Sequence, residues 1–269
     1  MTSYVASSAE TSESRVPPPA GVWQRFTEAN KRICHGFFQP RIYTISHLSA
    51  LEWWFRRRAE SLPTRQRMLE FGSGRDFPIS RLLRDCFVER EGTDLEDVPE
   101  QYWPEGVTYR KCSDSKLPFE DGRFDAVVIR SVLEHVADPA EVFKELSRVL
   151  KPGGRIFMNL PNKWDYVSVI SRCAGPLKSR LLHKLVPGAW DDFPVYYRCN
   201  TRGALERAVT ASGLSIENFR PFPSEPGCLK FFVPFYLAGA VYQFAISMLA
   251  LDALQPAFLV VLRKGEPLA

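Results

Sequence analysis

Residues 124–160 read FDAVVIRSVLEHVADPAEVFKELSRVLKPGGRIFMNL, and this stretch decides the fold class. Phe124 to Ile129 is almost entirely apolar, which is typical of a strand buried on both faces of a parallel sheet. Pro139 to Leu150 has the spacing of an amphipathic helix with proline near its first turn. Lys151-Pro-Gly-Gly154 ends this helix, and Arg155 to Leu160 reads as the next strand. The order strand, helix, strand indicates a βαβ unit and therefore an open α/β sheet.

The same alternation continues on both sides of this stretch. Further strands are expected at Met68–Phe71, up to Asp94, at Val107–Tyr109, at Ser215–Pro221 and at Ala257–Leu262. Further core helices are expected over Ile79–Cys86 and from Thr201, a good N-cap, to about Ser212. Together with the central unit, these segments give seven strands.

Composition excludes several classes of protein. The chain has 269 residues, of which 45% are hydrophobic and 25% charged, so it is neither collagen, coiled coil nor largely disordered. Its net charge of +4 is too small to indicate a nucleic-acid binder. Its six cysteines have no CxxC spacing, which favours reduced thiols in a cytoplasmic protein and predicts no metal site. The mean hydropathy of −0.19 is that of a soluble protein.

A glycine-rich turn follows the first strand. Glu70-Phe-Gly72-Ser-Gly74 lies between this strand and the next helix, where glycine lets the backbone approach a ligand and the helix offers N–H groups. Asp94 ends the second strand, 22 residues after Gly72. Nucleotide-binding α/β folds place an acid there to accept hydrogen bonds from both ribose hydroxyls. Phe77 at the third glycine position of GxGxxG argues against a nicotinamide enzyme.

The motif set closely resembles the class I S-adenosylmethionine-dependent methyltransferases, in particular the subgroup that includes the ubiquinone and menaquinone methyltransferases. Besides the glycine turn and Asp94, the matching motifs are Leu117-Pro-Phe119, Phe124-Asp125, Leu133-Glu-His-Val136 and Arg148-Val-Leu-Lys-Pro-Gly-Gly154. The resemblance covers about residues 67–162. It implies a Rossmann-like, mostly parallel seven-stranded sheet with an antiparallel last strand and helices on both faces.

The resemblance also implies site residues. Glu70, Gly72 and Gly74 would line the methionine part of S-adenosylmethionine, Asp94 would hold its ribose and Leu95 would pack on its adenine. Asp114 would bind the adenine amino group, and Arg130 with Ser131 would flank the sulfonium. The expected cofactor-binding set is completed by Ser73 and Ser115.

Two departures from the family pattern stand near this site. Asp76 replaces the third glycine of the family turn, which adds a side chain and a charge beside the loop. Ser113 stands where the family more often has its adenine-binding acid, and Asp114 comes one residue later. The second departure puts the register of the adenine contact in question, not the fold.

The remaining segments divide the chain around this core. We expect a disordered tail over residues 1–21, a helical cap over 22–66, the cofactor-binding core over 67–161, a lid or acceptor insertion over 162–200, and the rest of the core over 201–269. Residues 163–190 hold five Lys or Arg and one Asp, which suits either an anionic headgroup or a solvated helix face. The acceptor contacts expected from position alone are Asp191, Asp192, Tyr196 and Tyr197.

His135 is the candidate catalytic residue. A base is needed only when the acceptor must lose a proton, and histidine titrates in the right range for that task. The alternative is a histidine that orients Glu134 or hydrogen-bonds at the edge of the sheet.

An uncharged run from Phe231 to Leu251 lies within an apolar helical insertion at 229–254. Its 21 residues would suffice to cross a bilayer, but it lies between two strands that the family pairs as a hairpin. It is expected instead to pack on the protein or to lie in a membrane interface. Residues 22–66 carry eight Lys or Arg, three Glu and many aromatics, a composition that suits an anionic lipid surface.

These features predict a methyltransferase that acts on a small-molecule acceptor, either lipophilic or phosphate-bearing, such as a lipid, a quinone or a lipid-linked glycan. The expected location is the cytoplasm, with peripheral membrane association and no nucleic-acid partner. The alternative is a catalytically silent cofactor-binding or scaffold protein of the same fold. The acceptor atom and the oligomeric state do not follow from the sequence.

Overall fold

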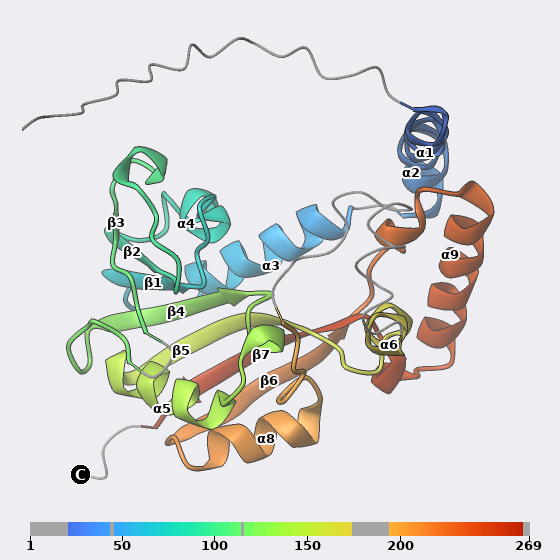
Figure 1. Cartoon of the computed structure of the whole chain (residues 1–269). Coiled ribbons are helices and arrows are strands. Elements are labelled where there is room, and N and C mark those ends of the chain that lie inside the picture. Colours follow the sequence, from blue (N-terminus) through green and yellow to red (C-terminus); the bar gives the residue numbers. More distant parts are fainter. Residues whose placement is uncertain (1–20, 44–45, 114–115, 174–193, 266–269) are drawn as a thin grey trace, which may run out of the picture.

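A seven-stranded sheet forms the centre of the molecule (Figure 1). In the computed structural model, which describes residues 21–43, 46–113, 116–173 and 194–265, the strand order is β3-β2-β1-β4-β5-β7-β6. The first five are parallel, and β7 is antiparallel to both of its neighbours. This confirms the expected fold class. The strands are β1 (Arg67–Phe71), β2 (Glu89–Thr93), β3 (Val107–Tyr109), β4 (Phe124–Arg130), β5 (Leu150–Pro161), β6 (Leu214–Phe222) and β7 (Ala257–Lys264).

Helices cover both faces of the sheet because side chains alternate along the buried strands. On one face, Val127 and Ile129 of β4 pack with residues of α5 (Pro139–Val149) and α8 (Arg202–Thr210). On the other face, Ala126 and Val128 pack with residues of α3 (His47–Glu60) and α4 (Pro78–Leu82). Figure 1 shows these two helical layers above and below the sheet.

Two boundaries differ from those expected. The helix expected over Ile79–Cys86 ends at Leu82, because Leu83 leaves helical geometry (φ −99°, ψ 21°) and the chain turns towards β2. Strand β5 starts at Leu150 rather than Arg155. Leu150 pairs with Phe124 and Arg155 with Ala126, so the intervening Lys-Pro-Gly-Gly segment is an irregularity within the strand.

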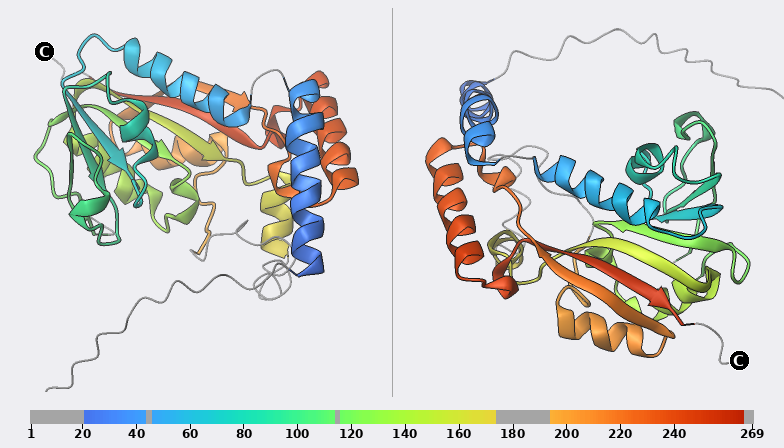
Figure 2. Two further views of the ribbon diagram at one scale, coloured as in Figure 1. Left: turned by 90° about the horizontal axis from the view of Figure 1, so that it is seen from above. Right: turned by 180° about the vertical axis from the view of Figure 1, so that it is seen from behind.

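The connections outside the central layers include four 3₁₀ turns. They are η2 (Glu100–Tyr102), η3 (Leu133–His135), η5 (Gly227–Leu229) and η6 (Asp252–Leu254). A separate group of helices lies beyond the carboxyl ends of the parallel strands (Figure 2). It contains α1 (Val22–Ile33), the π-helix η1 (Cys34–Phe38), α2 (Gln39–Ile42), α6 (Tyr166–Cys173) and α9 (Val233–Met248).

The N-terminal helices are bonded to the start of α9. The Asn30 side chain accepts a hydrogen bond from the backbone N–H of Val233 (3.0 Å). Lys230, only 7% exposed, donates to Gln39 Oε1 (3.1 Å) and to Glu225 Oε1 (2.9 Å). These buried contacts join two segments about 200 residues apart in the sequence, so residues 22–42 of the cap and the apolar insertion form one helical unit.

The apolar run Phe231–Leu251 contains α9, which packs one of its faces on the protein and leaves the other face exposed. Gly239 and Gln243 of α9 are buried, and Gln255 next to η6 hydrogen-bonds both Gln243 and Ser247. Among the described residues, no helix is long and apolar enough to cross a membrane. Trp54 and Phe55 belong to the core instead of a lipid surface, because α3 lies on the sheet with Trp54 edge-on to Phe157.

Candidate functional site

The glycine-rich turn joins the carboxyl ends of β1 and β2. The backbone N–H groups of Gly72 and Ser73 both donate to the carbonyl of Thr93 (2.9 and 3.1 Å). Gly72 (φ +73°) and Gly74 (φ +54°) adopt left-handed conformations that favour glycine. At Gly72 a Cβ would also lie 2.3 Å from a methyl group of Val132. The turn therefore has a fixed shape, and it lies beside the β1/β4 switch point, where doubly wound folds bind ligands.

Asp94 lies beside this turn, as the sequence predicts for a ribose-binding acid. Its Oδ2 accepts the backbone N–H of Gly74 (2.8 Å), and its Oδ1 accepts that of Glu96 (3.3 Å). Leu95 is exposed and could pack on a purine ring. Apart from Gly74 itself and its two chain neighbours, no described atom lies within 4 Å of the place where a Cβ of Gly74 would stand, so the turn is open to a ligand. Asp114 and Ser115 lie outside the described residues.

Glu70 has a structural role that the sequence did not indicate. Its carboxylate is buried and accepts the backbone N–H groups of Ile79 (2.9 Å) and Ser80 (2.7 Å) at the start of α4. Burial raises the pKa of Glu70, while these hydrogen bonds and the charge of Arg130 lower it. Glu70 thus links β1 to α4 and holds the turn between them, and its predicted contact with methionine stays a prediction.

The departure at Asp76 is accommodated by Phe77. Asp76 is exposed, and the chain then places Phe77 in a left-handed conformation (φ +47°) with its side chain fully buried. A non-glycine residue in this region costs about 1–2 kcal/mol. The Phe77 ring offsets this cost by packing edge-on to Tyr109 and against Gly92, where a Cβ would lie 2.4 Å from the ring. A glycine inside strand β2 was the one available signal of this close approach.

The end of β4 meets the end of β5. Ser131 (φ +52°) donates from its hydroxyl to Asn159 Oδ1 (2.8 Å). Asn159 is buried, and Arg130 is close enough to Glu70 to influence its pKa. Arg130 and Ser131 therefore lie on the same side of the switch point as the glycine-rich turn. Ser73 is buried in that turn, and its hydroxyl donates a hydrogen bond to the carbonyl of Gly74 (3.3 Å).

His135 lies under the segment that returns from the insertion. Its Nδ1 is 2.9 Å from the carbonyl oxygen of Pro194. Because a carbonyl only accepts hydrogen bonds, Nδ1 must carry a proton, which places the basic lone pair on Nε2. The carbonyl of Glu134 accepts the backbone N–H groups of Tyr196 (2.7 Å) and Tyr197 (3.2 Å). This tautomer is compatible with a base, and both interpretations of His135 stay open.

The four expected acceptor contacts have different outcomes. Asp191 and Asp192 lie outside the described residues. Tyr196 is 42% exposed, whereas Tyr197 lines a cavity of about 280 Å³ together with Asp165 of the 162–165 turn and Glu225. Asp165 and Glu225 were not expected, because nothing in the sequence indicates that the two segments meet. Within the described residues, no cluster of His, Cys, Asp and Glu could hold a metal.

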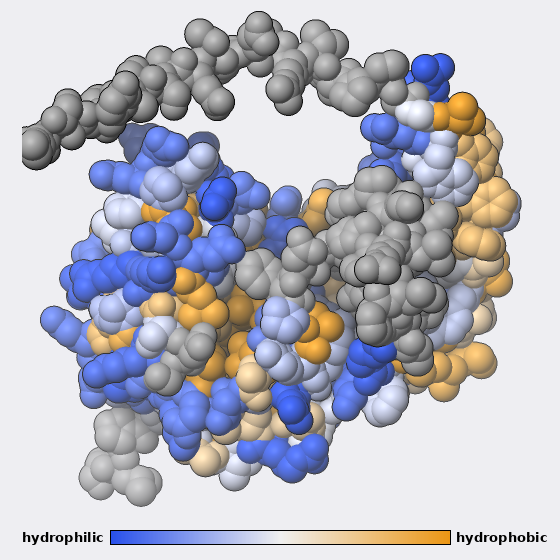
Figure 3. Space-filling model, in the orientation of Figure 1, coloured by the Kyte–Doolittle hydropathy of each residue, from blue (hydrophilic) through white to orange (hydrophobic). Residues whose placement is uncertain are grey.

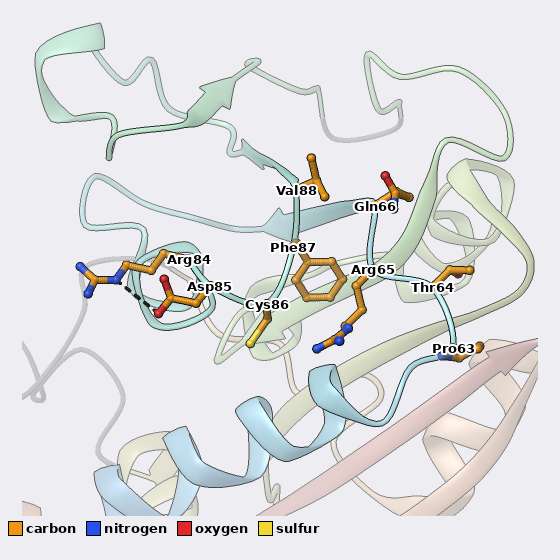
Figure 4. Close-up of a pocket in the computed structure, with 9 residues that line it drawn as sticks. All are labelled: Pro63, Thr64, Arg65, Gln66, Arg84, Asp85, Cys86, Phe87 and Val88. Atoms are coloured by element: carbon orange, nitrogen blue, oxygen red, sulfur yellow. Dashed lines mark ion pairs between the residues drawn. The ribbon is translucent and has the colours of Figure 1, made fainter.

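A second cavity lies at the opposite end of the sheet (Figure 4). Its volume is about 460 Å³, and residues 63–66 and 84–88, which lead into β1 and β2, line it. Figure 4 shows Arg84 and Asp85 pairing at its edge. Since it lies at the amino ends of the strands, it is separate from the glycine-rich turn and from the site described above.

The sheet order, the glycine-rich turn and the adjacent acid define a nucleotide-binding protein of the doubly wound class. The family model described as a methyltransferase domain matches residues 69–158. Residues 69–158 form a methyltransferase domain, the class that the sequence resembles, and its expected cofactor is S-adenosylmethionine. The resemblance seen in the sequence is thereby confirmed.

Several known proteins are similar to this chain. The ubiquinone biosynthesis O-methyltransferase of Azotobacter vinelandii is 35% identical over 111 residues, which is 41% of this chain and 45% of that protein. The ubiquinone/menaquinone biosynthesis C-methyltransferase UbiE of Desulfotalea psychrophila is 41% identical over 61 residues, 23% of this chain and 25% of that protein. The chain thus spans less than half the length of these curated relatives.

A solved structure supports the fold. The S-adenosylmethionine-dependent methyltransferase of Mesorhizobium loti superposes with a TM-score of 0.51 at 18% identity, over 81% of this chain and 100% of that one. At this identity the likeness concerns the fold, which extends well beyond residues 69–158.

Proposed function

We propose that this chain transfers the methyl group of S-adenosylmethionine to a lipophilic acceptor at a membrane surface. The observation that carries the proposal is the outer face of α9, which is apolar and exposed. Phe235, Val241, Phe244 and Met248 are between 51% and 70% exposed, and no residue of α9 is charged. Figure 3 shows apolar residues gathered along the edge of the molecule over α9. Relatives named for ubiquinone biosynthesis support the choice of a lipophilic acceptor.

The N-terminal helices extend this apolar face. Trp23 stacks on Phe26 (5.3 Å between ring centroids), and Phe26 contacts Phe232 before α9 (6.1 Å). Residues 22–42 carry Arg25, Lys31, Arg32 and Arg41 against Glu28, a net charge of +3. Exposed aromatics beside basic side chains are typical of helices that lie in an anionic membrane interface. The face would then bring the carboxyl ends of the strands close to membrane-dissolved molecules.

The chemistry requires little of the protein beyond placement. The cofactor, when bound, supplies an electrophilic methyl group. Gly72, Gly74 and Asp94 would hold it at the switch point, and Arg130 with Ser131 would border its reactive end. Holding the acceptor in line with the methyl group supplies much of the rate acceleration. For an acceptor that loses a proton, Nε2 of His135 is the proposed base.

Labelled-methyl transfer tests this function. The protein is incubated with methyl-labelled S-adenosylmethionine and either a total lipid extract or an aqueous extract of cells. We expect label in the lipid extract, and its loss in Asp94→Ala, because that variant lacks the ribose-binding acid. Label confined to the aqueous extract would contradict a lipophilic acceptor. Cofactor binding without transfer to either extract would favour the silent cofactor-binding protein instead.

Vesicle co-sedimentation tests the membrane surface. Wild type should bind vesicles that contain phosphatidylglycerol more tightly than vesicles of phosphatidylcholine alone. The double variant Phe244→Ser/Met248→Ser removes two exposed apolar side chains, which contribute together about 3 kcal/mol, or roughly 100-fold in partitioning. The matched control is Val88→Ser/Tyr102→Ser, which also removes two exposed side chains. Val88 directly precedes β2, and Tyr102 lies in η2, between β2 and β3. Equal binding of the two double variants would refute this surface.

A further inference from the structure

We infer that the cavity between α6 and residues 224–228 binds a hydroxyl-bearing ring of the acceptor, and that Asp165 accepts the hydrogen bond of this hydroxyl. The inference rests on the proposed function and names the site that it would use. The cavity holds about 280 Å³, close to the lower limit of roughly 300 Å³ for small-molecule pockets, which suits a single ring.

The cavity lies next to the proposed site of methyl transfer. Pro161, the last residue of β5, lines the cavity. It lies two residues after Asn159, which accepts the hydrogen bond of Ser131. Tyr197 also lines it, and the backbone N–H of Tyr197 donates to the carbonyl of Glu134 beside His135. The cavity therefore borders the ends of β4 and β5, on the side where an acceptor must meet the methyl group.

Asp165 has one carboxylate oxygen in use and one without a partner. Its Oδ2 accepts the backbone N–H of Val167 (3.0 Å) and caps α6. Its Oδ1 has no hydrogen-bond partner, although the residue is only 5% exposed. An unpaired buried carboxylate oxygen is costly, and a hydrogen-bond donor on a ligand would satisfy it. Burial also raises the pKa of Asp165 to about 6.

The other walls favour a neutral ring. Tyr166 and Tyr197 face the cavity together with Pro161, Pro226 and Pro256, which are flat or apolar surfaces. Glu225, the second carboxylate of the lining, is neutralised by Lys230 (2.9 Å). An ammonium group would also suit Asp165, but it has no lone pair with which to attack a methyl group. A hydroxyl that donates to a carboxylate keeps its lone pairs, so a hydroxyl fits both the cavity and the reaction.

Calorimetric titration with matched probes tests the site. The intact chain is titrated with 4-ethylphenol, with its methyl ether 4-ethylanisole and with 4-ethylbenzylamine. Wild type should bind the phenol roughly 10- to 100-fold more tightly than the ether, as expected for a hydrogen bond to a charged group. Asp165→Asn keeps a capping oxygen for α6 but presents an N–H group to the cavity, so its preference should fall below about threefold.

Asp138→Asn is the matched control, because Asp138 caps α5 in the same way but is exposed and lies away from the cavity. It should keep the preference of wild type. Equal binding of phenol and ether by wild type would overturn the inference, as would a preference that survives in Asp165→Asn or tighter binding of the amine. If any of these overturning results is found together with methyl transfer to the lipid extract, the proposed cavity site is wrong and the proposed function stands. If wild type prefers the phenol but transfers no methyl group, the cavity site stands and the proposed function is refuted.

Discussion

Asp165→Asn is expected to stabilise the fold while it impairs the acceptor site. The carboxylate of Asp165 is buried, and this burial raises its pKa from the ordinary 3.8 to about 6. The difference corresponds to about 3 kcal/mol of unfolding free energy that the ionised side chain costs the folded protein. Asparagine carries no charge and caps a helix about as well as aspartate, so the variant should recover most of this amount.

The raised pKa of Asp165 determines how the stability gain of the variant depends on pH. Above pH 6 the carboxylate is ionised in both states, and the folded protein bears the full cost. As the pH falls from about 6 towards 3.8, the folded protein takes up the proton first and the cost disappears. Burial also raises the pKa values of the neighbouring Tyr166, Tyr197, Tyr242 and Cys228, so these groups stay neutral in this range.

Urea unfolding at pH 8 and at pH 4 measures the effect. We expect Asp165→Asn to exceed wild type by about 3 kcal/mol at pH 8 and to equal it near pH 4. Asp138→Asn, at an exposed cap, should show no such gain. A variant that is less stable than wild type at pH 8, or a gain that does not change with pH, would refute the reasoning.

Three further substitutions probe other contacts. Gly92→Ala would place a Cβ 2.4 Å from the ring of Phe77, so urea unfolding should show a loss of about 1–3 kcal/mol that Phe77→Leu partly restores; an unchanged stability would contradict this packing. Lys230→Met would leave the largely buried Glu225 without its cation and should lower the unfolding free energy by about 3–5 kcal/mol; a change below 1 kcal/mol would show that the pair is dispensable. Asp94→Ala should weaken the binding of S-adenosylmethionine at least tenfold by calorimetry, and equal affinity would refute the ribose assignment.

The sheet and the cofactor turn could be predicted because their signals are local. Alternating apolar strands and amphipathic helices give the order of elements, and Gly72, Gly74 and Asp94 lie within one short stretch of chain. The structure brings the carboxylate of Asp94 to the N–H of Gly74, and the contact of Asp94 with the ribose stays a prediction.

Pairings between distant segments could not be predicted in this way. Lys230 meets Glu225 and Gln39 only because α9 packs on the N-terminal helices, and no periodicity encodes that contact. In the sequence, Asp165 is only the single acid among the basic residues of the 163–190 segment. Its unpaired oxygen becomes visible only once residues 224–228 close the cavity over it.

Methyl transfer on intact vesicles tests the central claim most directly. Vesicles prepared from cell membranes are incubated with methyl-labelled S-adenosylmethionine and either wild type or Phe244→Ser/Met248→Ser, and label is counted in the extracted lipid. We predict incorporation by wild type and at least a tenfold lower rate in the variant, with Val88→Ser/Tyr102→Ser equal to wild type. Absence of label in the lipid with wild type, or equal rates in all three proteins, would contradict a methyltransferase that works at the membrane surface through α9.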